Sequence, residues 1–366
     1  MSTALGARLG ARIRRDGPMA VEAFMAACLG DPRDGYYIRR DPLGVAGDFI
    51  TGPEISQMFG ELIGLWCAEM WRRMDRPRPF PLVELGPGRG TLASDAVRAI
   101  GQAMPDCARA LDLHLVETSP ALRERQRQAL GARPVTWHDA LATVPEGPIL
   151  VIANEFFDAL PIRQFQRTAD GWHERLVDTA TDGGFQFVAG PPLAAPPAAA
   201  PRVLARARPG DVIEVCEAGR RLIGDIADRL GRHGGGALVI DYCYPDGGPG
   251  ETLQAVKAHR RHDPLHDPGE ADLTAHVDFA ALAAAAGDGV SVHGPVHQRT
   301  WLRRLGIDQR LAGLTARAPE ADRAGLVAGY RRLTDGDQMG TLFKALALGA
   351  KGLDAPPGFD ADAGDF

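Results

Sequence analysis

The chain has 366 residues, of which 45% are hydrophobic and 24% are charged, and its formal net charge is −6. A chain of this length is able to bury a large core in one enlarged domain or two. Its acidic balance argues against a nucleic-acid partner, and no apolar run is long enough for membrane insertion. The five scattered cysteines form no C-x-x-C pair, which indicates a reducing compartment, and we expect a cytoplasmic location.

The first part of the chain, 1–76, is predicted to form a helical cap. Its basic, Ala-rich start weakly resembles a mitochondrial presequence, but 1–15 contains only one Ser, and we interpret it as a first helix. Apolar residues recur at helical spacing in 19–29 and again in 55–74. A glycine-rich stretch with Gly47, Asp48 and Glu54 lies between these helices.

A glycine turn between an apolar strand and a helix follows the cap. The strand is 82–85, the turn is Gly86-Pro-Gly-Arg-Gly90, and the helix is 91–104. Such a turn lets backbone N–H groups approach a ligand closely at the carboxyl end of the first strand of a doubly wound sheet. The spacing G-x-G-x-G differs from the dinucleotide fingerprint G-x-G-x-x-G, and no Lys-Ser/Thr pair follows, which excludes a Walker phosphate loop.

Further apolar runs predict the rest of an α/β, Rossmann-like, doubly wound sheet. Strands are expected at 111–117, 135–139, 149–153 and 237–241, and several end on polar residues, namely Glu117, Asp139 and Asn154. Two more strands, 289–293 and 342–348, are expected around helices within 298–333. The alternating pattern of 162–188 predicts an inserted antiparallel meander, and the polar run 244–272 predicts a lid.

These elements divide the chain into consecutive segments. We expect the helical cap at 1–76, the core at 77–161 and 216–243, and the meander and an Ala/Pro linker at 162–215. The lid occupies 244–273, the last part of the core with its helical insertion 274–350, and a mobile acidic tail 351–366.

The acid-x-Gly-x-Gly-x-Gly pattern at 84–90 resembles the first motif of class I S-adenosylmethionine (SAM) methyltransferases. Several longer segments are similar to one family among them, the MidA-type methyltransferases, whose mitochondrial members are complex I assembly factors. The matching segments are 47–56, 82–90, Asn154-Glu-Phe-Phe-Asp-Ala-Leu-Pro161 and 259–279. The resemblance implies a class I fold, SAM as the cofactor, and protein arginine N-methylation in mitochondrial members, with a complex I subunit as one protein substrate. The sequence leaves a homodimer open.

The resemblance also implies which residues contact the cofactor. Gly86, Gly88 and Gly90 would admit the methionine part of SAM, and Glu84 would face its ammonium group through water. Glu117 is suited to accept both ribose hydroxyls, because a carboxylate has no donor to clash. Asp139 is expected to accept from the adenine amino group. The remaining expected cofactor contacts are Asn154, Gly47 and Asp48.

Methyl transfer to an arginine needs a carboxylate that grips the guanidinium and receives a proton. We expect Glu155 and Asp158 in this role, with Asn154 orienting the reactants, although acids here also suit a helix N-terminus. Substrate contacts are expected from Glu54, whose alternative is helix capping, and from Phe157, Glu270 and Asp272. The histidines of 259–267 have a spacing imaginable for zinc, but we expect no metal, because methyl transfer requires none.

Other functions stay open at this point. One is a methyltransferase that acts on another amine or on nucleic acid. Another is an assembly chaperone that keeps a SAM-binding fold without turnover. A dinucleotide oxidoreductase is disfavoured by the glycine spacing.

Overall fold

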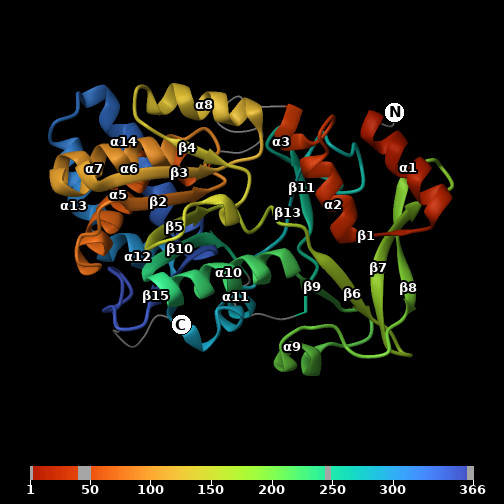
Figure 1. The fold of residues 1–366 in the computed structure, drawn as a ribbon. Coiled ribbons are helices and arrows are strands. Elements are labelled where there is room, and N and C mark those ends of the chain that lie inside the picture. The colour runs from red at the N-terminus through yellow and green to blue at the C-terminus, as the bar shows by residue number, and fades with distance from the viewer. Residues whose placement is uncertain (1–2, 40–50, 244–248, 361–366) are drawn as a thin grey trace. The chain divides into compact units, whose positions relative to one another are not determined.

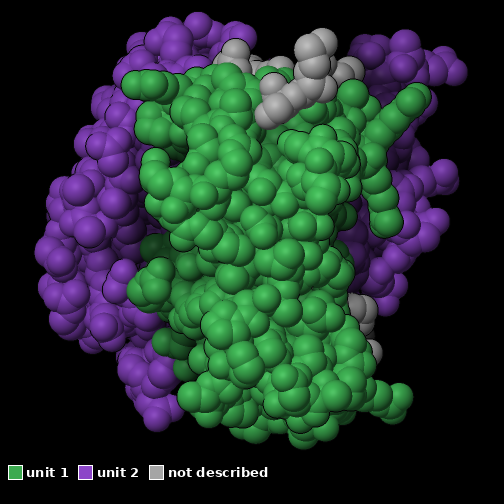
Figure 2. Space-filling view, turned by 90° about the vertical axis from the view of Figure 1, so that its right-hand side faces the viewer, with its two compact units in different colours: residues 1–49, 157–222, 244–285 green, residues 50–156, 223–243, 286–366 purple. Residues whose placement is uncertain are grey.

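The computed structural model describes residues 3–39, 51–243 and 249–360. The chain forms two compact units, each built from stretches that are far apart in the sequence (Figure 2). Unit 1 comprises Met1–Phe49, Phe157–Leu222 and Tyr244–Ala285. Unit 2 comprises Ile50–Phe156, Ile223–Cys243 and Ala286–Phe366. The predicted helical cap is therefore distributed over both units.

Unit 2 contains a mixed sheet with the strand order β14-β15-β10-β5-β2-β3-β4 (Figure 1). The neighbours from β10 to β4 are parallel, and β15 runs antiparallel to both β10 and β14. The strand order reverses between β2 and β5, and such a switch point is where open α/β sheets bind ligands. The strands are β2 (Phe80–Leu85), β3 (Leu111–Val116), β4 (Thr136–His138), β5 (Ile149–Asn154), β10 (Gly235–Tyr242), β14 (Val290–His297) and β15 (Phe343–Ala350).

Helices cover this sheet, and every residue of β2, β5 and β10 is buried, as expected of strands covered on both faces. The α-helices of unit 2 are α4 (Gly52–Ile55), α5 (Gln57–Arg73), α6 (Thr91–Ala103), α7 (Pro105–Ala110), α8 (Pro120–Leu130), α12 (Gln298–Arg304), α13 (Ile307–Thr315), α14 (Glu320–Thr334) and α15 (Met339–Leu342). Short 3-10 turns lie at Leu141–Thr143 and Gly287–Gly289. Helix α10 (Glu217–His233) passes from unit 1 into unit 2.

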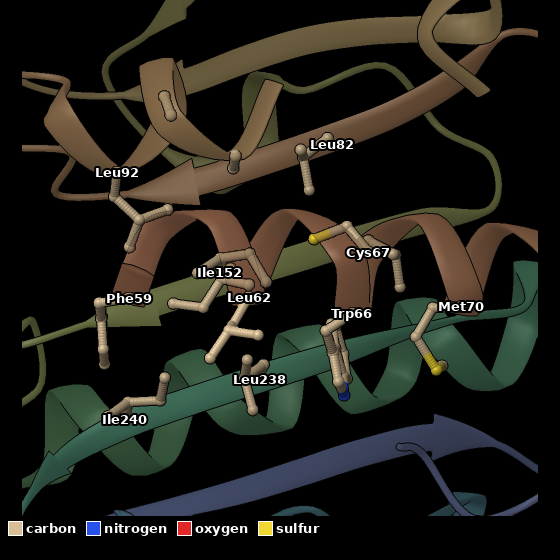
Figure 3. Packing of buried hydrophobic residues seen from close by; sticks show 14 of the residues in the cluster. Phe59, Leu62, Trp66, Cys67, Met70, Leu82, Leu92, Ile152, Leu238 and Ile240 are labelled. Carbon is tan, nitrogen blue, oxygen red and sulfur yellow. The ribbon is translucent and has the colours of Figure 1, made fainter. Parts of the chain in front are cut away.

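Helix α5 supplies much of the core of unit 2. Its N-terminus is capped by the Ser56 hydroxyl, which accepts from the Met58 N–H at 3.3 Å. Trp66 and Met70 are buried in one cluster with Leu238 of β10, as Figure 3 shows. Each such side chain contributes roughly 1.5–3 kcal/mol through burial. The same cluster extends along α5 and the strands to Phe59, Leu62, Leu82, Ile152 and Ile240.

Helices α5 and α6 pack closely because glycine faces the contact. A Cβ atom at Gly64 would lie 2.3 Å from the Ala96 carbonyl oxygen and 2.7 Å from its Cα. No side chain fits in that space, so the two backbones meet directly. The contact fixes the middle of α6, the helix that follows the glycine turn.

Unit 1 contains two further sheets, both antiparallel. One has the order β1-β7-β6-β9 with β8 paired to β7, and the other has the order β12-β11-β13. The strands are β1 (Met19–Ala20), β6 (Arg163–Arg167), β7 (Trp172–Thr179), β8 (Phe185–Pro192), β9 (Val212–Val215), β11 (Gln254–Lys257), β12 (Arg260–His262) and β13 (Asp272–Thr274). The helices are α1 (Ala4–Asp16), α2 (Val21–Gly30), α3 (Tyr36–Arg39), α9 (Pro201–Arg206) and α11 (Phe279–Ala285).

The antiparallel meander predicted for 162–188 is confirmed by strands β6, β7 and β8. The polar run 244–272, predicted as a lid, carries a strand hairpin in its described part, and its role as a lid stays a prediction. Strands β11 and β12 are joined at Ala258 and His259, whose φ angles are 51° and 58°. Two consecutive residues with positive φ angles match the twist of a two-residue hairpin turn. Such turns usually have the sequence Asn-Gly.

Two segments predicted to be irregular are ordered where the structure describes them. The Ala/Pro stretch 190–201 includes the end of β8 and leads into α9. The acidic tail is described as far as residue 360, and there Phe359 is buried beside Trp301, with 6.4 Å between ring centroids. Burial of an aromatic ring accounts for the order of this part of the tail.

Candidate functional site

The candidate site lies at the carboxyl edge of the sheet in unit 2. Leu85 of β2 is paired with Val116 of β3 and Ala153 of β5, and Val116 is paired with His138 of β4. The residues that follow these strands are therefore neighbours along one edge. The structure brings together Gly86, Glu117, Asp139, Asn154 and Glu155, each of which the sequence predicted as a site residue.

The glycine turn leaves little room for a side chain at Gly86 or at Gly90. Gly86, Gly88 and Gly90 have φ angles of 60°, 53° and 82°, which L-residues rarely adopt. A Cβ atom at Gly86 would lie 2.6 Å from the Phe156 ring, and one at Gly90 would lie 3.2 Å from the Gln126 Cα. The turn is thus a bare backbone segment that ends at the N-terminus of α6.

Glu117 is buried at the end of β3 with donors on both carboxylate oxygens. Its Oε1 accepts from the Ser119 N–H at 2.8 Å, and its Oε2 accepts from the Gln126 amide at 3.2 Å. Burial raises the pKa of Glu117, while these donors oppose the shift. Because a carboxylate has about four acceptor positions, the group is held in place and still has capacity for further donors.

Asp139 follows β4 and is strongly exposed. Its carboxylate accepts from the Arg123 guanidinium at 2.7 Å, and 82% of its side chain faces solvent. Arg123 also donates through Nε to the Glu117 carbonyl oxygen at 2.8 Å. The structure thus links Asp139 to the backbone at Glu117 through Arg123, a residue that no sequence motif indicated.

Glu84 lies within β2 and is 5% exposed. Its removal from water raises the pKa of Glu84 to about 8. A carboxyl group with this pKa is mainly protonated at neutral pH when no cation is near. A bound cation would favour its ionised form and lower the pKa.

Asn154 ends β5, and Glu155 follows it in a strained backbone conformation. Glu155 has a φ angle of 49°, and its N–H donates to the Ile240 carbonyl oxygen at 2.9 Å. Its Oε1 accepts from the Gly52 N–H at 2.8 Å and from the Asn154 amide at 3.1 Å. A non-glycine residue in this conformation costs of order 1–3 kcal/mol, and such strain gathers at functional sites.

Asn154 also has a buried oxygen available for a ligand. Among the described residues, its Oδ1 has no hydrogen-bond partner. A buried unpaired acceptor costs roughly 1–3 kcal/mol, which a bound donor would recover. The Asn154 side chain therefore presents an acceptor at the edge where the glycine turn lies.

Glu54, predicted to contact substrate, braces the start of α6. Its Oε1 accepts from the Thr91 hydroxyl at 2.5 Å, and its Oε2 lies 4.0 Å from the Arg89 guanidinium. Arg89 and Thr91 flank Gly90 in the sequence, so Glu54 is attached to both sides of that glycine. Its predicted contact with substrate stays a prediction.

The other predicted site residues belong to unit 1 or lie outside the described residues. Asp158 is buried, and its carbonyl oxygen accepts from the Ala275 N–H at 2.9 Å. The Tyr37 hydroxyl donates to the Asp272 carboxylate at 3.0 Å. Burial, together with the charges of Asp272 and Asp158, raises the pKa of Tyr37. Unit 1 thus brings these two acids around one tyrosine that sequence reasoning missed.

Phe157 and Glu270 also belong to unit 1. Phe157 lines a small cavity of about 30 Å³ together with Glu214, Cys216 and His276. Glu270 is half-buried, and its N–H donates to the Asp267 carbonyl oxygen at 2.9 Å. Glu155 and Asp158, predicted as a pair, fall in different units. Gly47 and Asp48 lie outside the described residues.

Two further properties of the described residues bear on other kinds of site. No group of three or more His, Cys, Asp or Glu side chains in the described ranges is arranged to hold a metal ion. In the same ranges, we find no helix with the length and apolar character needed to cross a membrane. In the histidine-rich segment, His262 and Lys257 are both placed beside Asp267, at 3.5 and 2.8 Å.

Comparison with known proteins gives relatives over most of the chain. A family model of S-adenosyl-L-methionine-dependent methyltransferases matches residues 62–296. The frog Xenopus tropicalis protein arginine methyltransferase NDUFAF7, mitochondrial, is 38% identical over 92% of this chain and 84% of its own length. The Drosophila melanogaster homolog of the same name is 40% identical over 94% and 84%. The human protein is 38% identical over 92% and 81%.

Two solved structures also resemble the chain over nearly its full length. A COG1565 superfamily member from Burkholderia thailandensis, bound to S-adenosyl-homocysteine, has a TM-score of 0.84 and 29% identity, and covers 99% of this chain and 95% of its own. A native structure of a COG1565 superfamily protein from the same organism has a TM-score of 0.80 and 30% identity, with the same coverage. The predicted class I fold and the predicted SAM cofactor are confirmed.

The predicted cytoplasmic location is wrong, because the relatives are named as mitochondrial proteins. Scattered free cysteines indicate only a reducing environment and do not distinguish one reducing compartment from another. The predicted methyltransferase activity agrees with the relatives and with the family model. The chain belongs to this family of S-adenosyl-L-methionine-dependent methyltransferases and resembles the MidA-type members from which its fold and cofactor were predicted.

Proposed function

We propose that this enzyme is a protein arginine N-methyltransferase whose substrate is a subunit of respiratory complex I or a similar protein. The names of the relatives support arginine as the acceptor, and the resemblance to MidA-type proteins supports complex I. The arrangement of Asn154 and Glu155 carries the proposal, because it offers a buried acceptor and an oriented carboxylate beside the glycine turn.

The residues at the sheet edge fit SAM in charge and in shape. The bare glycine turn leaves space for the methionine part, and the donor-held carboxylate of Glu117 suits the two ribose hydroxyls. Glu84 is buried with a raised pKa, and Asn154 has an unpaired oxygen. An ammonium group would favour the ionised form of Glu84 and would offer donors to the Asn154 oxygen. Asp139 is exposed and follows β4, at the edge of the sheet, and it is assigned to contact the adenine.

Bound SAM supplies a methyl group on a positively charged sulfur. The substrate guanidinium has a pKa above about 12 and is a weak nucleophile until its proton leaves. We assign Glu155 to hold this group and to accept that proton, because the Gly52 N–H and the Asn154 amide fix its carboxylate. In the transfer, a nitrogen–carbon bond forms as the carbon–sulfur bond breaks, and the guanidinium loses one proton.

Asp158 is assigned as the second carboxylate. It follows Glu155 by three residues and is buried near Tyr37 and Asp272 in unit 1. Phe157, Glu54, Glu270 and Asp272 are assigned to the substrate side without specified contacts.

The test compares Glu155→Gln with Glu124→Gln, an exposed acid on α8. The substrate is complex I purified from cells that lack this enzyme, incubated with SAM carrying a labelled methyl group. We expect Glu155→Gln to lower the rate by about 100-fold or more while the affinity for S-adenosyl-homocysteine stays within a factor of about two. Equal rates for Glu155→Gln and Glu124→Gln would refute the assigned role of Glu155.

A further inference from the structure

Gln126 on α8 is a buried polar residue that no motif accounts for. Its side chain is 0% exposed, although its neighbours Arg125 and Arg127 are exposed. A buried amide is costly unless its donors and acceptor are paired. Its partners therefore indicate why a glutamine occupies this position.

The Gln126 amide joins two parts of the cofactor site. Its Nε2 donates to the Gly88 carbonyl oxygen at 2.8 Å and to Glu117 Oε2 at 3.2 Å. The first partner belongs to the glycine turn, and the second is the carboxylate at the end of β3. One amide group thus sets the spacing between these two elements.

Trp137 fixes the orientation of this amide. The Trp137 Nε1–H donates to Gln126 Oε1 at 2.7 Å. An indole N–H has no acceptor character, so it must face the oxygen, and the amide NH₂ must then point toward Gly88 and Glu117. The Arg127 guanidinium stacks on the Trp137 ring with its carbon 4.8 Å from the ring centroid, which helps to hold the indole.

The backbone of α8 also lies close to the glycine turn at this residue. A Cβ atom at Gly90 would be 3.2 Å from Gln126 Cα and 3.3 Å from its Cγ. The turn is therefore confined on one side by Gln126 itself. A shift of the glutamine would be transmitted both to the turn and to Glu117.

The geometry points to Gln126 and Trp137 as a positioning pair that orients the Glu117 carboxylate and the glycine turn for the adenosine and methionine parts of the cofactor. This inference rests on the cofactor contacts assigned under the proposed function. Neither residue is assigned a contact with the reacting atoms. Their effect is on cofactor affinity and on recognition of the ribose, which depends on the direction of the carboxylate.

The experiment measures ligand binding by calorimetry for Gln126→Met and for the matched control Gln128→Met. Gln128 is exposed on the same helix. The probes are S-adenosyl-homocysteine, adenosine and 2′-deoxyadenosine. We expect Gln126→Met to weaken S-adenosyl-homocysteine binding by about tenfold, since two hydrogen bonds that hold the site are lost. Gln128→Met should bind like the parent.

Discrimination of the ribose separates positioning from a general loss of stability. The parent should prefer adenosine to 2′-deoxyadenosine, and this preference should fall several-fold in Gln126→Met because Glu117 is no longer held. Trp137→Phe keeps an aromatic ring in place and removes the N–H donor, so the preference for adenosine should fall by a smaller factor even if Gln126→Met does not fold.

Two results would refute the positioning role. If the parent binds and discriminates, and both variants keep its affinity and its preference for the 2′-hydroxyl, the positioning role is refuted while the proposed function stands. If the parent binds S-adenosyl-homocysteine but shows no preference for the 2′-hydroxyl, the contact assigned to Glu117 is refuted, and the positioning role with it.

Discussion

The most specific prediction concerns the pH dependence of stability caused by Glu84. This residue is 5% exposed, and burial raises its pKa from 4.5 to about 8. In the unfolded chain the carboxyl group ionises near 4.5, whereas in the folded chain it keeps its proton up to about 8. Between these values the folded state binds one more proton than the unfolded state, so stability falls as pH rises.

The size of the effect follows from the pKa difference. Stability is lost at about 1.4 kcal/mol for each pH unit between the two pKa values. The slope falls to half at the folded pKa, so the loss is about 2 kcal/mol between pH 6 and pH 8 and about 3 kcal/mol once pH 9 is reached. Glu84→Gln has no proton to lose and should lack this slope.

The assay is urea unfolding of the parent and Glu84→Gln without cofactor, at pH 6, 7, 8 and 9. The difference in free energy of unfolding between the two proteins should change by about 3 kcal/mol in favour of the variant from pH 6 to pH 9. All other titrating groups are common to both proteins and cancel in this difference. Parallel curves for the two proteins would refute the reasoning, because Glu84 would then ionise alike in the folded and unfolded chain.

Three further predictions use other features of the structure. Binding of SAM at pH 7 should release a proton from Glu84, since the cofactor's positive charge favours the carboxylate. Calorimetry in two buffers of different ionisation enthalpy measures this release, and identical binding heats in the two buffers would contradict it. Gly86→Ala should weaken SAM binding by roughly 1–3 kcal/mol, which is about 5- to 150-fold, because its φ angle is 60° and the new methyl group would meet Phe156 at 2.6 Å. An unchanged affinity would contradict this prediction. Gly64→Ala should lower the free energy of unfolding by about 1–3 kcal/mol through its contact with Ala96 and leave the SAM affinity of the folded protein unchanged, and urea unfolding beside a binding titration tests both parts.

The sheet of unit 2 was predictable because its strands are buried on both faces. Continuous apolar runs that end on polar residues, such as 149–153, are typical of strands in a covered parallel sheet. The glycine turn was predictable for a related reason, since three glycines between a strand and a helix indicate left-handed backbone and bare N–H groups. Together these features indicated the position of the candidate site.

Other parts of the site depend on contacts between distant segments and leave no local signal. Gln126 is a glutamine in an ordinary helix, and only its burial against Gly88 and Glu117 distinguishes it. The left-handed Glu155 is stabilised by Gly52, about one hundred residues earlier in the chain. The placement of Tyr37 with Asp272 likewise joins segments separated by most of the chain.

The hairpin at Ala258 and His259 was missed for a different reason. Neither residue is the Gly, Asn or Asp that usually occupies such a turn, so the usual turn chemistry is absent from the sequence. The pairing of β11 with β12 and β13 imposes the conformation instead. Tertiary pairing overrides local preference here, and the polar composition of the segment gave no sign of it.

The most direct test of the proposed function is to identify the amino acid that receives the methyl group. Complex I from cells lacking this enzyme is incubated with the purified parent protein and methyl-labelled SAM, and the labelled protein is hydrolysed to amino acids. We expect label in methylarginine with the parent and a loss of at least about 100-fold with Glu155→Gln. Label in lysine or in nucleic acid, or binding of S-adenosyl-homocysteine without any transfer, would contradict the proposed function.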